Sequence, residues 1–597
     1  MEKELITGGE AIGQVLKEEG VRYLFGIGGG HVFPLITGIV GQGIRMIHMR
    51  HEQTGVYAAD GYARSARKVG VCFGTAGPGM TNMLSGITQA FICRSPVLCL
   101  FGQHLTSEDR REPIQEAYGA EITRTITKWS ARAVDQRMLS FLTKKAMREM
   151  LIYPPGPVAL EIPLNILARR DKTAGQRAFT PDSKFPAKEM MGSAGNPAAV
   201  EKLVEMILSA ERPVIVAGDG VHWANASREL QEVIKLLQVP VLTRRIARGA
   251  VPETDPLAFS SRTRDGVLKN ADLAVAIGLR IGYLEGYGRW ARKLPRFVQI
   301  NESEAEIKNE VPTDLAIVGN PRIILQQMIE ILRQNPEKVK VKTDWIKAVQ
   351  TIKTEAQGKS RQEAESFQKN PPVHPAYLAQ EIVDFLDDSA TIVYDAFTGT
   401  YYLTDRVRST FPGKILDAGE HAGVGHGIGM GIGAQLARPG KQVLVMMGDG
   451  GMGIGGMDVE TAVRCKLPVV FLVNNNSAWM AGSFDMYFRK YLGEENNWSI
   501  TPGCRYDKMF EATGCHGEHV EKPEEIRPAL ERAFNSGKPA VVNVVVDPKV
   551  IHKGMMLNMD PAAVGWLEPD QIPEAGRKIV YREDPLKSPG KGSIHKQ

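Results

Sequence analysis

Short, continuous apolar runs alternate with longer stretches of helical periodicity along most of the chain. The runs at 97–101, 214–217 and 469–473 are apolar throughout, without polar alternation, which predicts strands buried on both faces of a parallel sheet. Helical stretches between such strands are typical of α/β folds. The pattern therefore predicts parallel sheets wrapped by helices.

These runs fall into three groups separated by polar stretches. The groups span residues 1–185, 195–335 and 371–550. A loop rich in Pro, Lys, Gly and Ser follows the first group, and a charged, helix-like segment at 338–369 follows the second. Because 597 residues exceed what one core accommodates, we expect an α/β protein of three doubly wound parallel-sheet domains.

Residues 551–597 have a different character. Methionines and a tryptophan lie among prolines and glycines, and Lys- and Arg-bearing residues follow. Two interpretations stay open for this C-terminal tail. It is either a disordered end or a flap that closes over an active site.

Composition and charge exclude several classes of protein. Hydrophobic residues make up 43% of the chain and charged residues 24%, as in soluble globular proteins. A net charge of +5 is small for this length and argues against a nucleic-acid-binding surface. No apolar run reaches the roughly 20 residues that a membrane-spanning helix needs. The N-terminus lacks a signal sequence and the six cysteines include no C-x-x-C pair, so we expect a cytoplasmic protein.

Candidate metal ligands follow two buried strands of the third group. The Gly-Asp-Gly triplet 448–450 ends one apolar run, and the run 469–473 ends at the Asn triplet 474–476. In a strand–helix–strand unit both strand ends open on the same sheet edge, where α/β proteins bind ligands. Asp449 and Asn476 should therefore converge, with glycines that let backbone approach a phosphate. Such oxygen ligands suit Mg²⁺.

A second group of polar and glycine residues lies in the first domain. Glu52 opens a predicted helix, and a strand at 70–74 runs into the glycine turn 75–79. Asn82 and Gln115 follow. Glu52 alone would be interpreted as a surface glutamate at a helix start, but the strand and glycine turn at 70–79 that follow it favour a functional role.

Together these motifs resemble thiamine-diphosphate (ThDP) enzymes of the acetolactate-synthase-like branch, over about residues 5–550. The resemblance implies a pyrimidine-binding (PYR) domain, a middle domain and a diphosphate-binding (PP) domain. It implies that Glu52 hydrogen-bonds the aminopyrimidine N1′ and that Mg²⁺ lies on Asp449, Asn476 and the backbone carbonyl of Ala478. In that branch different subunits share each cofactor, which implies an obligate homodimer, assembled further into a homotetramer.

Other positions match places where the family contacts its cofactor or moves protons. The cofactor-binding candidates are Gly77, Pro78, Asn82, Thr398, Gly423, Val424, Gly425, Gly448, Gly450, Asn475 and Ala478. The proton-transfer candidates besides Glu52 are Gln115, His104, Glu494 and Glu495. Relatives often carry a larger residue such as Met where Val424 falls, which leaves the supporting role of this side chain open.

The middle domain of this branch binds ADP, FAD or no ligand. Gly218, Gly220, Arg280 and the basic loop 244–248 could cradle nucleotide phosphates. Asn301 stands where relatives usually show Asp near a ribose, and solvated surface arginines are the alternative interpretation.

The choice of reaction depends on a few positions. Acetolactate synthases carry a tryptophan nine residues beyond the metal asparagine, and this chain has Asp485 there. The segments 456–462 and 505–509 look like oxalyl-CoA decarboxylases and 2-hydroxyacyl-CoA lyases. We therefore expect a carbon–carbon lyase that cleaves a 2-hydroxyacyl-CoA to formyl-CoA and an aldehyde or ketone. The alternatives are a carboligase acting on pyruvate or another 2-oxo acid, an oxalyl-CoA decarboxylase, and a non-enzymatic binding protein.

Overall fold

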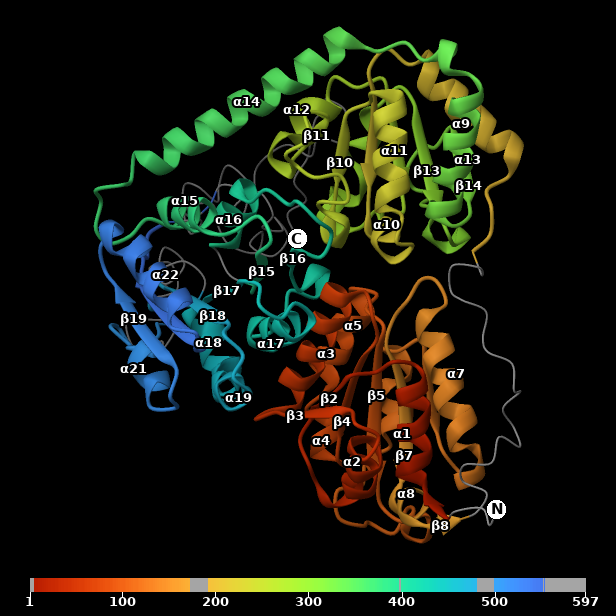
Figure 1. Cartoon of the computed structure of the whole chain (residues 1–597), viewed down its shortest axis with the longest axis vertical. Helices are drawn as coiled ribbons and strands as arrows, with labels where there is room; N and C mark the ends of the chain where they lie inside the picture. The colour runs from red at the N-terminus through yellow and green to blue at the C-terminus, as the bar shows by residue number, and fades with distance from the viewer. Residues whose placement is uncertain (1–4, 172–191, 397–398, 480–498, 551, 553–597) are drawn as a thin grey trace, which may run out of the picture.

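Three six-stranded sheets, each with all neighbouring strands parallel, form three α/β domains along the chain (Figure 1). The computed structural model describes residues 5–171, 192–396, 399–479, 499–550 and 552. The fold class predicted from the apolar runs is confirmed. Among the described helices, none combines the length and the apolar character needed to cross a bilayer.

The first sheet has the strand order β3-β2-β4-β5-β7-β6. Its strands are β2 (Tyr23–Gly26), β3 (Arg45–His48), β4 (Gly70–Gly74), β5 (Val97–Gln103), β6 (Trp129–Arg132) and β7 (Val158–Pro163). The main helices are α1 (Gly8–Glu18), α2 (Phe33–Val40), α3 (Glu52–Ala66), α5 (Leu84–Ile92) and α7 (Leu139–Leu151). A short antiparallel pair, β1 (Ile6–Thr7) with β8 (Arg170–Asp171), joins the two ends of the domain.

The middle sheet has a different order, β11-β10-β9-β12-β13-β14. Its strands are β9 (Pro213–Ala217), β10 (Val241–Thr243), β11 (Ala258–Phe259), β12 (Leu273–Ile277), β13 (Phe297–Asn301) and β14 (Leu315–Val318). Its helices include α9 (Pro197–Ser209), α10 (Asp219–Trp223), α11 (Ser227–Leu237), α12 (Arg264–Leu268) and α13 (Pro321–Gln334). The chain order therefore reverses between β9 and β12, which are neighbours in the sheet.

The third sheet, β16-β15-β17-β18-β20-β19, repeats the topology of the first. Its strands are β15 (Thr391–Tyr394), β16 (Ile415–Leu416), β17 (Val443–Gly448), β18 (Val470–Asn475), β19 (His516–Val520) and β20 (Ala540–Val545). Its helices include α15 (Pro375–Phe385), α16 (Thr400–Arg406), α17 (Gly427–Ala437), α18 (Asp449–Gly455), α19 (Val459–Cys465), α21 (Tyr506–Glu511) and α22 (Ile526–Asn535). The shared topology supports a duplicated pair of domains.

One long helix, α14 (Thr343–Glu365), connects the middle domain to the third and runs along the outside of the molecule (Figure 1). It occupies the charged segment for which the sequence predicts helical character. The indole N–H of Trp345 donates to the carbonyl of Pro213 at 3.0 Å, which attaches the start of the helix to the middle sheet.

One hydrophobic cluster spans the first and third domains, which also have clusters of their own, whereas the clusters of the middle domain include no residue of either. The shared cluster forms around α3 and α17, which pack backbone to backbone. A Cβ at Gly429 would lie 2.4 Å from the carbonyl oxygen of Thr54, and one at Gly433 would lie 2.0 Å from that of Ala58. These glycines therefore permit the close approach of the two helices.

Candidate active site

Glu52 is the first residue of α3 and is 8% exposed. The preceding residue, His51, is extended, and its ring accepts the backbone N–H of Gln53 at 3.2 Å, which caps the helix. The amide of Asn82 donates to Glu52 Oε2 at 3.0 Å. The helix start and the glycine turn of the first domain therefore hold one buried carboxylate.

The glycine turn also brings Gln115 to this place. Gly77 has φ +60°, and a Cβ there would lie 2.8 Å from the carbonyl oxygen of Gln115. Pro78 then begins the short helix α4 (Pro78–Thr81), and a Cβ at Gly79 would lie 3.5 Å from Glu52 Oε1. The sequence-predicted Glu52, Gly77, Pro78, Asn82 and Gln115 thus form one cluster, which we call the glutamate cluster.

His104 follows β5 and is almost fully buried. Its Nε2 lies 2.8 Å from Asp109 Oδ1 and 4.0 Å from Glu116 Oε1. Arg132 also binds Asp109, at 2.5 Å. The buried Nδ1 has no hydrogen-bond partner among the described residues. His104 therefore belongs to a network with Asp109 and Glu116, and Glu116 is the residue next to Gln115.

Asp449 begins α18 directly after β17 and is 2% exposed. Its Oδ1 accepts the backbone N–H of Gly450 at 3.0 Å, and its buried Oδ2 has no hydrogen-bond partner within the described part of the chain. Burial raises the pKa of Asp449 to about 6, against the backbone N–H groups of Gly450, Ser477 and Ala478, which favour the charged form. The described residues therefore keep this carboxylate from water, and backbone N–H groups are what favour its charged form.

The Asn triplet 474–476, which ends β18 and begins the turn after it, lies beside this carboxylate, as the strand–helix–strand pattern predicts. Gly448 and Asn474 are paired in the register of β17 and β18, so Asp449 and Asn476 follow adjacent strand ends. Asn476 is half-buried. The buried side-chain oxygen of Asn474 has no hydrogen-bond partner among the described residues.

Asn475 has a structural set of contacts. Its amide donates to the carbonyl of Cys504 and to Asn543 Oδ1, both at 3.1 Å. Its oxygen accepts the N–H of Ser477 at 3.1 Å, and Ser477 adopts φ +56°. Asn475 thus shapes the turn that carries Ala478, whereas a cofactor contact was expected of it from the sequence and stays a prediction.

A third element, the glycine loop at 423–427, depends on a residue that sequence reasoning missed. Asp395 follows β15, is buried, and accepts the N–H groups of Gly425 at 2.9 Å and Gly427 at 2.7 Å. His426 Nε2 lies 2.8 Å from the carbonyl of Tyr394. Val424 is half-buried within this loop. An acidic residue directly after a buried strand was the available signal for Asp395.

These observations fit a divalent cation with a diphosphate. The unpartnered buried Oδ2 of Asp449 is an acceptor that a hard cation would satisfy. Glycines at 425 and 450 leave no room for side chains, since a Cβ would lie 2.8 Å from Ile454 and 2.9 Å from Trp479, respectively. The residues present therefore fit ThDP with Mg²⁺. Thr398, Glu494, Glu495, Asp485 and the tail from 553 lie outside the described residues.

Comparison with known proteins defines the class. Family models of the thiamine pyrophosphate enzyme match in chain order: the N-terminal TPP binding domain over 6–122, the central domain over 200–328 and the C-terminal TPP binding domain over 398–544. Thiamine pyrophosphate is another name for ThDP. The chain belongs to the thiamine pyrophosphate enzyme family.

Relatives with two different activities are similar to this chain. A probable acetolactate synthase of Mycobacterium bovis is 31% identical over 92% of this chain and 97% of its own length. The 2-hydroxyacyl-CoA lyase of Arabidopsis thaliana is 27% identical over 91% of this chain and 96% of its own, and 2-hydroxyacyl-CoA lyase 1 of Homo sapiens is 25% identical over 92% and 96%. The protein is thus an acetolactate-synthase-like ThDP enzyme, similar to both groups.

Proposed function

We propose that the protein is a Mg²⁺- and ThDP-dependent carbon–carbon lyase that cleaves a 2-hydroxyacyl-CoA reversibly to formyl-CoA and an aldehyde or ketone. The observation that favours a lyase is Asp485, which stands where acetolactate synthases carry a tryptophan. The chain is also similar to 2-hydroxyacyl-CoA lyases over nearly their whole length.

The glutamate cluster and the Asp449 site take different tasks in this proposal. Asp449, Asn476 and the carbonyl of Ala478 hold Mg²⁺, and Gly425, Gly448 and Gly450 let backbone approach the diphosphate. Bound ThDP supplies the electron sink for cleavage of the bond beside a carbonyl. The protein itself supplies orientation and proton transfers.

Residues of the first domain carry out most of the proposed proton transfers. Glu52 shares a proton with N1′ of the aminopyrimidine, and Asn82 fixes the orientation of its carboxylate through the 3.0 Å contact. Gln115 and His104 are the groups proposed to serve the substrate end, together with Glu494. A buried carboxylate at a helix start suits this role because packing and the capped helix limit its motion.

In the assembled protein, we place Glu52 of one subunit opposite Asp449 of another. A homodimer would then be the smallest active unit, and a homotetramer the expected assembly. The substrate is a small acyl-CoA.

The test is to mix the protein with ThDP, Mg²⁺ and 2-hydroxyisobutyryl-CoA and to follow formyl-CoA by mass spectrometry. Glu52→Gln serves as the inactive control prepared in the same way. Formyl-CoA that depends on wild-type protein supports the lyase. Absence of formyl-CoA across a series of 2-hydroxyacyl chains would refute it.

A carboligase acting on pyruvate or another 2-oxo acid is the second candidate, because the acetolactate synthase relative shares 31% identity. Incubation with pyruvate alone distinguishes the two, since acetolactate would form only in this case. CO₂ release from oxalyl-CoA identifies the decarboxylase variant.

A further inference from the structure

The middle domain has the strand order of a dinucleotide-binding fold, so its ligand crevice should lie at the carboxyl ends of β9 and β12, where the order reverses. Both strand ends are glycine-rich there. A Cβ at Gly220 would lie 2.7 Å from the Cα of Gly278, and one at Gly218 would lie 2.5 Å from the Cα of Leu279. The two strand ends therefore pack against each other, which narrows the crevice.

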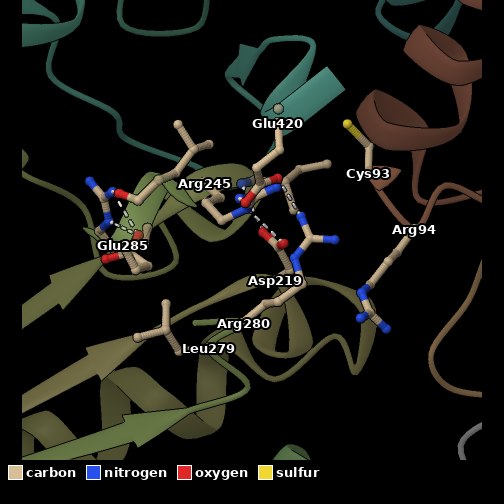
Figure 2. Close-up of polar contacts among 12 residues, drawn as sticks. Cys93, Arg94, Asp219, Arg245, Leu279, Arg280, Glu285 and Glu420 are labelled. Carbon is tan, nitrogen blue, oxygen red and sulfur yellow. Dashed lines mark hydrogen bonds and ion pairs between the residues drawn. The ribbon is translucent and has the colours of Figure 1, made fainter. Parts of the chain in front are cut away.

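Two arginines at this crevice are already paired with carboxylates (Figure 2). Arg245 binds Asp219 at 2.9 Å and Glu420 Oε1 at 2.5 Å, and Arg280 binds Glu420 Oε2 at 2.8 Å. Arg280 also donates to the carbonyl of Ile92 in the first domain. We call these four side chains, Asp219, Arg245, Arg280 and Glu420, the three-domain clamp, because they join the middle domain to the other two.

The remaining arginines of the basic loop are also engaged. Arg244 donates to Glu285 at 2.7 Å, and Arg248 donates to both oxygens of Glu253 at 2.6 and 3.0 Å. The arginines that were candidates for binding nucleotide phosphates therefore form ion pairs with carboxylates of the chain itself.

Electrostatics favour the charged forms of the clamp. Burial disfavours charge on both members of the Arg245–Asp219 pair, yet Asp219 and Glu420 together raise the pKa of Arg245 above its ordinary value. In turn, Arg245 and Arg280 lower the pKa of Asp219 although burial opposes this. The side chain of Glu420 is 18% exposed, so its two arginine contacts are largely shielded from water.

Glu420 lies in a short 3-10 turn (Gly419–His421) that leads directly into the glycine loop at 423–427. The next residue, His421, contacts Ser85 at 3.4 Å. Ser85 lies 3.0 Å from the hydroxyl of Tyr57, which accepts the amide of Gln53 at 3.1 Å. Hydrogen bonds thus connect this turn to the start of α3, next to Glu52.

We propose that Glu420, held by Arg245 and Arg280, is a positioning residue that sets the glycine loop for the diphosphate cofactor, and that this carboxylate fills the crevice in place of a nucleotide. The proposal rests on the proposed function only in that the loop contacts ThDP. It does not depend on which substrate is cleaved.

The experiment compares Glu420→Gln with Glu253→Gln. Both substitutions weaken a buried arginine pair of the middle domain that also contacts the third domain, since Arg248 donates to the carbonyls of Thr404 and Val407. Only Glu420 adjoins the glycine loop. Calorimetry measures ThDP affinity in excess Mg²⁺, and thermal unfolding of the same samples measures stability.

We expect Glu420→Gln to weaken ThDP binding by about 10- to 100-fold, the usual effect of removing a group that supports a binding residue. Glu253→Gln should lower the unfolding temperature and leave the affinity within about twofold. Equal affinities in the two variants would overturn the proposal. If Glu420→Gln does not fold, Arg280→Lys replaces it and should weaken ThDP binding measurably but less than tenfold. An unchanged ThDP affinity in that variant would again contradict the positioning role of Glu420.

A titration of the wild-type protein with ADP and with FAD tests the crevice itself. We expect no saturable heat from either compound. Saturable binding would show that the clamp opens for a nucleotide and would overturn the second half of the proposal. ThDP affinity is measured without substrate. A negative result for the positioning role of Glu420 is therefore distinguishable from a negative result for the lyase reaction.

Discussion

Asp449 is a carboxylate that the apoprotein buries at a cost. Its pKa is about 6 in the fold against an ordinary 3.8, so the folded state binds the proton more tightly than the unfolded state. The free energy of unfolding therefore falls as the pH rises from about 4 to about 6. Above that range the full destabilisation by the ionised Asp449 is present. Two pKa units correspond to about 3 kcal/mol.

Asp449→Asn should therefore stabilise the Mg²⁺-free protein at pH 8 by about 2 to 3 kcal/mol, with a smaller gain at pH 5, because the amide carries no charge. The same variant should lose Mg²⁺-dependent ThDP retention. Thermal unfolding in chelator at both pH values, with calorimetry of ThDP, measures the two effects.

Asp395→Asn is the matched control for Asp449→Asn. Both oxygens of Asp395 accept backbone N–H groups, so an amide nitrogen would face a donor there and should lower stability. A gain of stability in the control, or none in Asp449→Asn, would contradict the account of the unpaired carboxylate.

Glu52→Gln tests the proton-handling role at the other cluster. Glutamine has the same shape and keeps an oxygen for the amide of Asn82. We expect retained ThDP binding and a loss of turnover worth about 2 to 4 kcal/mol or more. Single-turnover kinetics with ThDP saturating provide the measurement, and near wild-type turnover would refute the assignment.

At the scale of residues, the sequence was informative where one strand–helix–strand unit sets the geometry. Asp449 and Asn476 could be predicted to converge because each follows a buried strand in one strand–helix–strand unit. Asp395 also follows a buried strand, but its role in holding the glycine loop could not be predicted, because Gly425 and Gly427 lie in a loop outside any strand–helix–strand unit that the apolar runs mark. The structural contacts of Asn475 depend on Cys504 and Asn543, which no local pattern connects to it.

At the scale of elements, the contact between α3 and α17 leaves no space for a methyl group. Gly433→Ala would place a Cβ 2.0 Å from the carbonyl oxygen of Ala58, so we expect a loss of about 1 to 3 kcal/mol in the free energy of unfolding. Gly358→Ala is the control. This glycine is exposed within α14 and has open space around its Cα, so alanine should add about 0.5 to 1 kcal/mol.

Chemical or thermal unfolding of the two glycine variants gives both values. A tolerated Gly433→Ala would show that the helices can move apart without cost. A destabilising Gly358→Ala would mean that α14 depends on flexibility at that position.

Most elements could be predicted because continuous apolar runs identify buried parallel strands. The two-residue β16 is too short for such a signal. A run of glycines predicts either a cofactor loop or close packing. The structure shows close packing at Gly429 and Gly433 of α17, and the cofactor role of the loop at 423–427 stays a prediction.

At the scale of the whole molecule, the proposed sharing of each cofactor between subunits has a quantitative consequence. If Glu52 and Asp449 act on one cofactor from different chains, a mixture of inactive Glu52→Gln and Asp449→Ala proteins should regain activity after subunit exchange. Equal amounts should give about a quarter of the wild-type rate, because half the dimers are mixed and each has one intact site. Rate assays before and after exchange provide the measurement.

No recovery of activity despite verified exchange would show that both groups serve a cofactor from the same chain. The sequence could predict the three domains, because apolar runs and polar separators mark them, but not their relative arrangement. That arrangement depends on pairs such as Arg245 with Glu420, which lie 175 positions apart and have no sequence pattern of their own.

The separate core of the middle domain has a consequence for engineering. Domains one and three pack helix against helix at backbone contact and share one of their hydrophobic clusters, so replacing either requires a matching change in the other. The middle domain has its own interior, and its contacts with its neighbours include hydrogen bonds of Arg245, Arg248 and Arg280. Grafting a homologous module that keeps these three arginines should therefore yield functional chimeras, whereas exchange of either flanking domain alone should not.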